Sequence, residues 1–182
     1  MIIARLSFNT NGWVNPSGSV GKSRSITTFE FKTGFGFEEW LFNKSFSFTD
    51  ENGDEWHFGY IEGIHKNYKL GDEEDSLQLF TIDARTKNRY VVAEINKWKV
   101  ISQNESANII HQHPQLIAQM IMDLPIINNV NPLIEFNNHL NNIGNKQLFN
   151  IAYKDSTYLF NLNNPLPSNN RIYNLHRFFL YR

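Results

Sequence analysis

Cysteine is absent from this chain of 182 residues, which excludes disulfide bonds and thiolate metal sites. No apolar run approaches the roughly 20 residues that a membrane helix needs, and the amino terminus does not resemble a secretory signal. These absences predict a cytoplasmic protein with no membrane partner. The hydrophobic fraction of 41% predicts that residues 1–182 fold as a single domain with its own core.

Acidic and basic residues are nearly equal in number. The formal net charge is −1, which argues against tight non-specific binding to a phosphate backbone. No acidic residue precedes Glu30. The segment Glu30-Phe31-Lys32 has the spacing of half a nuclease metal site, but its upstream aspartate is therefore missing. We interpret this match as chance.

Other catalytic signatures are incomplete. Segment 18–23 resembles part of a nucleotide-binding P-loop, but Pro16 stands where the first glycine belongs, and we expect a strand rather than a helix to follow. His111 and His113 have no third metal ligand nearby in the sequence. No Ser/His/Asp arrangement can be inferred from spacing, and no thiol nucleophile is available. We therefore expect no catalysis, no metal and no cofactor.

The pattern of apolar residues predicts an α+β fold with a mostly antiparallel, barrel-like sheet and a few flanking helices. Asn52-Gly53 predicts one hairpin turn, and the polar segment 84–88 predicts another. Late strands are expected to return and pair with early ones. The predicted strands are Ile2–Phe8, Ile26–Phe31, Phe46–Thr49, Glu55–Ile64, Leu77–Asp83, Tyr90–Ile101, Leu148–Tyr153, Tyr158–Leu162 and Ile172–Tyr181.

Helices are predicted in the middle of the chain. Segment 102–105 has the form of a capping box, and a second helix is expected from Pro114 to about Asp123. Asn131-Pro132 offers a cap and a first-turn proline for a third helix, which Gly144 is expected to end. That helix carries Leu133, Ile134, Phe136 and Leu140, which we expect on one side.

The most distinctive segment is Gly34-Phe35-Gly36-Phe37-Glu38-Glu39-Trp40. Glycines allow a ligand to approach the backbone, and aromatic faces beside them are suited to stacking on a nucleobase. Buried carboxylates need hydrogen-bond donors, which the edge of a base can supply. The sequence therefore predicts a base pocket. Its predicted members are Trp13, Phe35, Gly36, Phe37, Glu38, Glu39 and Trp40, with His57 and Tyr60 as secondary candidates.

Basic residues occur in two regions that could share a face of the fold and bind nucleic-acid phosphates. Scattered, solvated charges remain the equally simple alternative. The predicted phosphate-binding residues are Lys22, Ser23, Arg24, Arg85, Lys87 and Arg89.

The motifs N-G-W-x-x-P-S-G, G-K-S, G-F-G-F-E-E-W-L-F and W-H-F-G-Y-I, all within the first hundred residues, resemble the amino-terminal reader domain of bacterial modification-dependent restriction proteins. We place that domain in the PUA-like superfamily, beside the EVE, ASCH, YTH and SRA domains. The resemblance implies a small barrel that accepts a flipped, modified base for an antiviral restriction system. It also implies that a nuclease domain or GTPase motor, if present, lies outside this chain.

Three functions follow as hypotheses. The first is a non-catalytic module that recognises a modified base in duplex DNA. The second is a PUA-like module that binds RNA through the same pocket. The third is a protein-interaction domain with an aromatic patch. The sequence does not decide which base or modification is bound.

Overall fold

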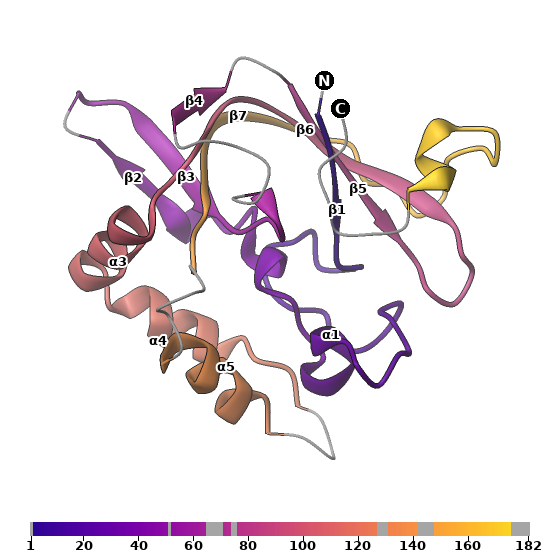
Figure 1. Cartoon of the computed structure of the whole chain (residues 1–182), viewed down its shortest axis with the longest axis horizontal. Coiled ribbons are helices and arrows are strands. Elements are labelled where there is room, and N and C mark those ends of the chain that lie inside the picture. Colours follow the sequence, from indigo (N-terminus) through magenta and orange to yellow (C-terminus); the bar gives the residue numbers. More distant parts are fainter. Residues whose placement is uncertain are drawn as a thin grey trace.

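The computed structural model describes residues 2–50, 52–64, 71–73, 76–126, 131–141 and 148–175. Its seven strands form one sheet in the order β1-β5-β6-β7-β3-β2, with β4 paired to β6 (Figure 1). Only β1 and β5 run parallel; the other pairs are antiparallel. The strands are β1 (Ile2–Leu6), β2 (Ser47–Thr49), β3 (Glu55–Gly59), β4 (Gly71–Glu73), β5 (Leu77–Ile82), β6 (Arg89–Val100) and β7 (Ile151–Tyr158).

The structure confirms the predicted α+β class and the mostly antiparallel sheet. The sheet is not closed: β1 and β2 lie at opposite ends of the strand order, so the predicted barrel is not confirmed. The predicted return of a late strand is confirmed, because β7 pairs with both β3 and β6. This pairing brings residues near position 57 beside residues near position 153, and it forms the floor of the site described below.

Short helices surround the sheet. Helices α3, α4 and α5 lie together beside the end of the sheet that contains β2 and β3, and α1 lies below β1 and β5 (Figure 1). None of the described helices combines the length and apolar character that crossing a membrane requires. The helices are α1 (Phe29–Thr33), α3 (Gln103–Gln112), α4 (Gln115–Met122) and α5 (Pro132–Asn141), and the 3-10 helices are η1 (Phe37–Trp40), η2 (Lys44–Phe46) and η3 (Arg171–Asn174).

Both predicted hairpins are confirmed. Strands β2 and β3 pair across a turn in which Asp50 Oδ1 accepts the amides of Asn52 and Asp54 at 2.9 and 3.0 Å. Gly53 takes a positive φ of 83° in this turn, a conformation that favours glycine. Strands β5 and β6 form the second hairpin. Local turn chemistry therefore sets the register of both strand pairs.

Two of the predicted helix starts have the expected caps. Ser102 Oγ accepts the amide of Glu105 at 3.1 Å at the start of α3, and α5 begins at Pro132. The predicted apolar side of α5 is partly wrong. Phe136 is buried, but Leu133 and Ile134 are 37% and 56% exposed. The predicted end at Gly144 lies outside the described residues.

The predicted strand Ile26–Phe31 is wrong, because α1 begins there. Thr28 Oγ1 accepts the amide of Phe31 at 3.3 Å as an N-cap, and Gly34 ends the helix with a φ of 72°. Near the carboxyl end, β7 replaces parts of two predicted strands, Leu148–Tyr153 and Tyr158–Leu162. The predicted strand Ile172–Tyr181 begins in the 3-10 helix η3, and its remainder lies beyond the described residues.

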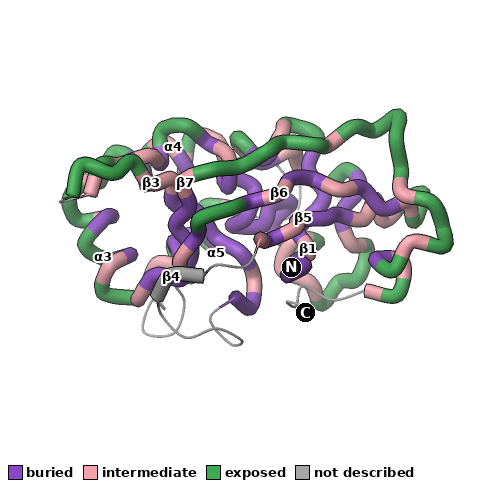
Figure 2. The backbone as a smooth tube through the Cα atoms, turned by 90° about the horizontal axis from the view of Figure 1, so that it is seen from above, coloured by how far each residue is buried: buried purple, intermediate pink, exposed green. Residues whose placement is uncertain are grey.

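The core has two main parts. One packs the inner face of β1, β5 and β6 against Trp13 and Leu41. The other packs η1 and the preceding aromatic residues against β3 and helices α3–α5. Figure 2 shows that β6 is buried along most of its length, whereas the second half of β7 is exposed. This exposed half of β7 forms one wall of a pocket.

Candidate functional site

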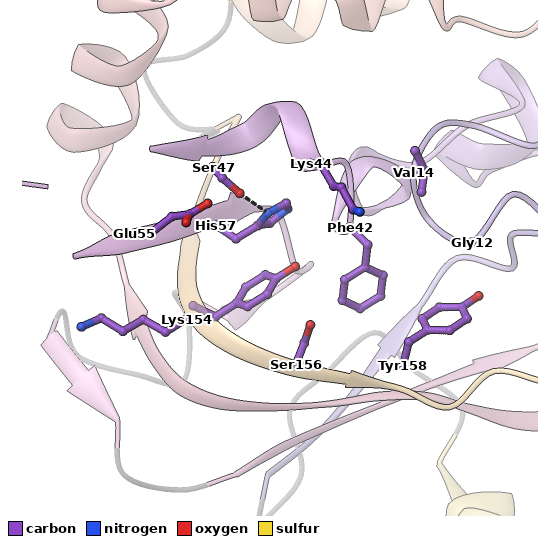
Figure 3. A pocket seen from close by; sticks show the side chains of 11 residues that line it. Gly12, Val14, Phe42, Lys44, Ser47, Glu55, His57, Lys154, Ser156 and Tyr158 are labelled. Atoms are coloured by element: carbon purple, nitrogen blue, oxygen red, sulfur yellow. Dashed lines mark hydrogen bonds between the residues drawn. The ribbon is translucent and has the colours of Figure 1, made fainter. Parts of the chain in front are cut away.

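A pocket of about 570 Å³ lies between β7, the β2–β3 hairpin and two loops that contain Gly12 and Phe42 (Figure 3). Its two ends differ in chemistry. Val14, Phe42 and Tyr158 lie at one end, and Ser47, Glu55 and His57 lie toward the other. A volume of this size lies within the usual range of ligand sites, roughly 300–1,000 Å³.

The aromatic end of the pocket is held by long-range contacts. Phe42 meets Tyr158 edge to face, with ring centroids 5.8 Å apart. The amide of Phe42 donates to the carbonyl of Trp13 at 2.8 Å, which fixes the loop. Tyr153 Oη donates to the carbonyl of Leu41 at 2.8 Å, and burial raises the Tyr153 pKa. Tyr158 is 48% exposed, so much of its side chain remains open to a ligand.

Ser47 and His57 form a hydrogen-bonded pair on the β2–β3 hairpin. They are direct partners in the strand register, and Ser47 Oγ lies 2.9 Å from His57 Nδ1. Burial lowers the pKa of His57 to about 4, while the nearby carbonyl of Leu41 raises it by less. His57 is therefore neutral at neutral pH. His57 Nε2 is buried and has no hydrogen-bond partner among the described residues.

The two lysines of the pocket differ in whether an acidic side chain pairs with them. Lys154 Nζ lies 2.7 Å from Asp54 and 4.7 Å above the ring of Trp56. Lys44 is exposed, and no described residue forms an ion pair with it. The ammonium of Lys44 is thus the cation at this pocket that is open to an anionic ligand.

The predicted base pocket is instead the interior of the protein. Trp13 and Phe35 have no exposed surface, and Trp40 is only 1% exposed. Trp13 Nε1 donates to the carbonyl of Ser7 at 3.1 Å, and Trp40 Nε1 donates to Asp123 at 2.9 Å. These rings pack against protein rings, so their faces are not open for stacking. The prediction is corrected for the whole segment, whose buried members are Trp13, Phe35, Gly36, Phe37, Glu38, Glu39 and Trp40.

Glu39 has the donors that the sequence analysis expected from a base. Its Oε1 accepts the amide of Gly36 at 2.8 Å. Its Oε2 accepts Asn9 Nδ2 at 2.6 Å and the amide of Ser17 at 3.1 Å, and it pairs with Lys22 Nζ at 3.0 Å. Burial raises the pKa of Glu39, and Lys22 lowers it by less. Protein groups therefore occupy the acceptor positions of this carboxylate.

Glu38 is buried in a second part of the same network. Ser7 contacts it twice, through the amide at 3.3 Å and Oγ at 2.9 Å. Burial, assisted by the negative charge of Glu30, raises the pKa of Glu38 to about 8. Ser7 Oγ also lies 3.2 Å from Glu30, so it bridges the two carboxyl groups. The cavity beside Ser7 accommodates about one water-sized group, too small for a base.

The two secondary candidates lie in different places. His57 lines the pocket at the β2–β3 hairpin. Tyr60 is buried and does not line that pocket. Its hydroxyl donates a hydrogen bond of 2.8 Å to Glu62. The structure therefore separates the two secondary candidates, and only His57 lines the pocket.

The structure brings the two predicted basic regions together. The amide of Ala84 donates to the carbonyl of Gly21 at 2.8 Å, which joins the loop at 18–24 to the β5–β6 turn. Arg24 and Lys87 are exposed there, and Ser23 is half-buried. Arg85 is half-exposed and makes a bidentate contact with Asp83 at 3.0 and 2.8 Å. We call Arg24, Arg85 and Lys87 the basic edge.

Two predicted phosphate ligands are corrected. Lys22 is 4% exposed, and its charge is paired with Glu39, so it cannot serve as a surface phosphate contact. Arg89 is also buried; it donates to the carbonyl of Lys87 at 3.1 Å and its guanidinium lies 4.4 Å from the centre of the Tyr173 ring. Both side chains stabilise the turns that carry the basic edge.

Most of the pocket is not evident from the sequence. Phe42 ends the motif G-F-G-F-E-E-W-L-F but was not among its predicted pocket members, and Lys44 and Ser47 follow in an ordinary-looking segment. Ser156 and Tyr158 lie two residues apart on β7, a spacing that places both on one face of a strand. That spacing was the available signal, but it identifies a site only when the pairing of β7 with β3 is known.

The described residues contain no cluster of three or more metal-ligating acidic or histidine side chains. His113, one of the rejected metal ligands, stacks on Phe48 with ring centroids 4.0 Å apart. In comparisons with protein-family models, curated proteins and solved structures, nothing matches this chain. The PUA-like resemblance of its first hundred residues therefore stays a prediction.

Proposed function

We propose that this chain is a non-catalytic, PUA-like reader that takes one modified base of duplex DNA into the pocket between β7 and the β2–β3 hairpin. The observation that carries the proposal is the composition of that pocket. It combines a half-exposed tyrosine, a phenylalanine and an unpaired lysine in a volume of about 570 Å³. Stacking, edge recognition and phosphate attraction are the three interactions that a flipped nucleotide requires.

Stacking is the first element of support. A base that enters at Tyr158 meets an aromatic side chain that is already positioned against Phe42. Aromatic stacking contributes about 1–3 kcal/mol per base, and it does not depend on which base is present. The pocket therefore has a source of affinity that is suited to any flipped base.

Polar groups at the other end of the pocket supply selectivity. Ser47 Oγ lies 2.9 Å from Nδ1 of neutral His57, and a hydroxyl has a further lone pair that can accept from an exocyclic amino group. Glu55 adds a carboxylate acceptor at this end, and Lys44 adds a donor near Phe42 (Figure 3). A site that pairs its polar groups with the ligand discriminates more strongly than an apolar site can, because a mismatched ligand leaves those groups unpaired.

The basic edge supports contact with the DNA backbone. The rings of Phe8, Tyr90 and Phe160 pack together beside the basic edge: Phe160 lies 5.6 Å from Tyr90 and 6.3 Å from Phe8. Arg85 lies 6.0 Å from the centre of the Phe8 ring. With a net charge of −1, phosphate contacts are local, and specificity comes mainly from the pocket.

The resemblance extends the proposal to a biological role. As the specificity domain of a restriction or antiviral defence system, the reader would direct a separate nuclease or GTPase motor to modified DNA. The chain itself would bind without cutting. Incubation with labelled modified duplex and divalent metal ions is expected to leave the DNA intact.

A titration tests the proposal directly. The purified protein is titrated at one fixed salt concentration against matched duplexes that contain cytosine, 5-methylcytosine, 5-hydroxymethylcytosine or N6-methyladenine. We expect tighter binding to at least one modified duplex than to its unmodified match. Equal binding to all duplexes together with tighter binding to RNA would favour the RNA-binding hypothesis. No binding to any nucleic acid would contradict the proposal and favour the protein-interaction hypothesis.

A further inference from the structure

The pocket is larger than a base requires. At about 570 Å³ the pocket is of the size that encloses a drug-sized ligand, which is larger than a single base. A base that stacks on Tyr158 fills the aromatic end and leaves the end near Ser47 and Glu55 unfilled (Figure 3). The remaining volume is therefore available to a substituent on the base.

The chemistry of the unfilled end indicates what that substituent is. Ser47 and Glu55 present a hydroxyl and a carboxylate group there, and Ser156 presents a second hydroxyl on the floor of the pocket between the two ends (Figure 3). A methyl group would leave these polar groups unpaired. A substituent with several hydroxyls can donate to and accept from each of them.

Tyr158 also presents a polar atom to the pocket. Tyr158 Oη has no hydrogen-bond partner among the described residues, and the loop opposite it has no side chain at Gly12. An added Cβ at Gly12 would lie 3.6 Å from Tyr158 Oη, an ordinary van der Waals contact, so this hydroxyl faces the backbone of the loop. Gly12 also adopts a φ of 69°, which other residues rarely take.

From this arrangement, we infer that the pocket binds a base together with an attached sugar, so that the preferred ligand is a glycosylated base rather than a methylated one. The inference rests on the proposed function, because it requires the base to enter this pocket. The base stacks at the aromatic end, and the hydroxyls of the attached sugar pair with the serine and carboxylate groups in the rest of the pocket.

Three duplexes that differ at one position test the inference. They carry cytosine, 5-hydroxymethylcytosine or glucosylated 5-hydroxymethylcytosine, and affinities are measured at one salt concentration. We expect the glucosylated duplex to bind about tenfold more tightly than the hydroxymethylated one, the effect of one or two added hydrogen bonds. Equal or weaker binding of the glucosylated duplex would overturn the inference while leaving the proposed function intact. No binding of any duplex in this set, or in the methylated set above, would overturn both.

Two variants locate the sugar. Ser156→Val removes a hydroxyl from the pocket, and we expect it to abolish most of the preference for the glucosylated duplex, measured as the ratio of the two duplex affinities in the same variant. Thr157→Val is the matched control, because Thr157 is exposed on the opposite face of β7. Thermal unfolding verifies that both variants are folded. A preference that survives Ser156→Val and also survives Glu55→Ala would place the sugar elsewhere and overturn the inference.

Discussion

The network around Glu39 and the pocket around Ser47 are both rich in polar groups, but they differ in what remains available to a ligand. Glu39 has no exposed surface, and its oxygens accept from a lysine, an asparagine and two backbone amides. At the pocket, Lys44 and Tyr158 reach solvent. Polar groups whose hydrogen bonds are all made within the protein stabilise the fold, whereas polar groups left open to solvent are available to a ligand. The comparison therefore assigns folding to the first region and ligand binding to the second.

The largest effect is expected from a substitution in the buried network around Glu39. Lys22→Met leaves Glu39 buried without its cation, and we expect a loss of about 3–5 kcal/mol in the free energy of unfolding. Urea denaturation measures this loss. Lys32→Met is the matched control, because Lys32 is exposed on α1 and its replacement is expected to cost less than about 0.5 kcal/mol. Similar effects of the two substitutions would contradict the structural role of Lys22.

The buried region should also make stability depend on pH. Burial raises the pKa of Glu38 from 4.5 to about 8, so the folded protein holds a proton that the unfolded chain releases. The stabilisation is complete below about pH 4.5 and is lost as the pH rises toward about 8. Between about pH 5 and pH 7 we expect a loss of about 3 kcal/mol. Glu38→Gln should flatten this dependence, whereas an unchanged slope in the variant would exclude Glu38 as its source.

At the pocket, Tyr158→Ala is expected to reduce affinity for the preferred modified duplex by about tenfold or more, because it removes a stacking surface worth about 1–3 kcal/mol. The substitution should change stability little, because Tyr158 is 48% exposed. Fluorescence anisotropy of a labelled duplex measures the affinity, and Thr157→Ala serves as the control. Unchanged affinity would show that the base does not stack at Tyr158.

The smallest effect concerns charge. Lys44→Gln removes the unpaired ammonium at the pocket, and we expect the slope of log affinity against log salt concentration to fall by about 1. Lys97→Gln is the control, because Lys97 is exposed and lies 3.5 Å from Asp155. Titrations at several salt concentrations measure both slopes. Equal changes for the two lysines would indicate a general charge effect without a phosphate at the pocket.

Local signals predicted much of the fold. The turn at Asn52-Gly53 and the cap at Ser102 are each decided within a few residues, and both appear in the structure as expected. Segment Ile26–Phe31 was mispredicted because its apolar and β-branched residues favour a strand, while the side chain of Thr28 caps a helix instead. The strand propensity of this segment was outweighed by the hydrogen bond from the Phe31 amide to Thr28 and by Gly34, which ends the helix.

The site was harder to predict, because no local pattern defines it. His57 and Tyr153 are 96 positions apart and become neighbours only through the β3–β7 register. Trp13 and Glu39, which are conspicuous in the sequence, satisfy each polar group from within the fold. These conspicuous residues form a specific hydrogen-bonded interior. The sequence alone could not distinguish such an interior from a ligand-binding site.

Amide hydrogen exchange, with and without a saturating modified duplex, tests the central claim most directly. The account predicts slower exchange on binding in segments 42–47, 55–58 and 153–158, which border the pocket, and in the loops of the basic edge. Segment 36–40, which holds the buried carboxylates, should exchange at the same rate in both states. Protection confined to segment 36–40, with none in segment 153–158, would contradict the assignment of binding to the open pocket.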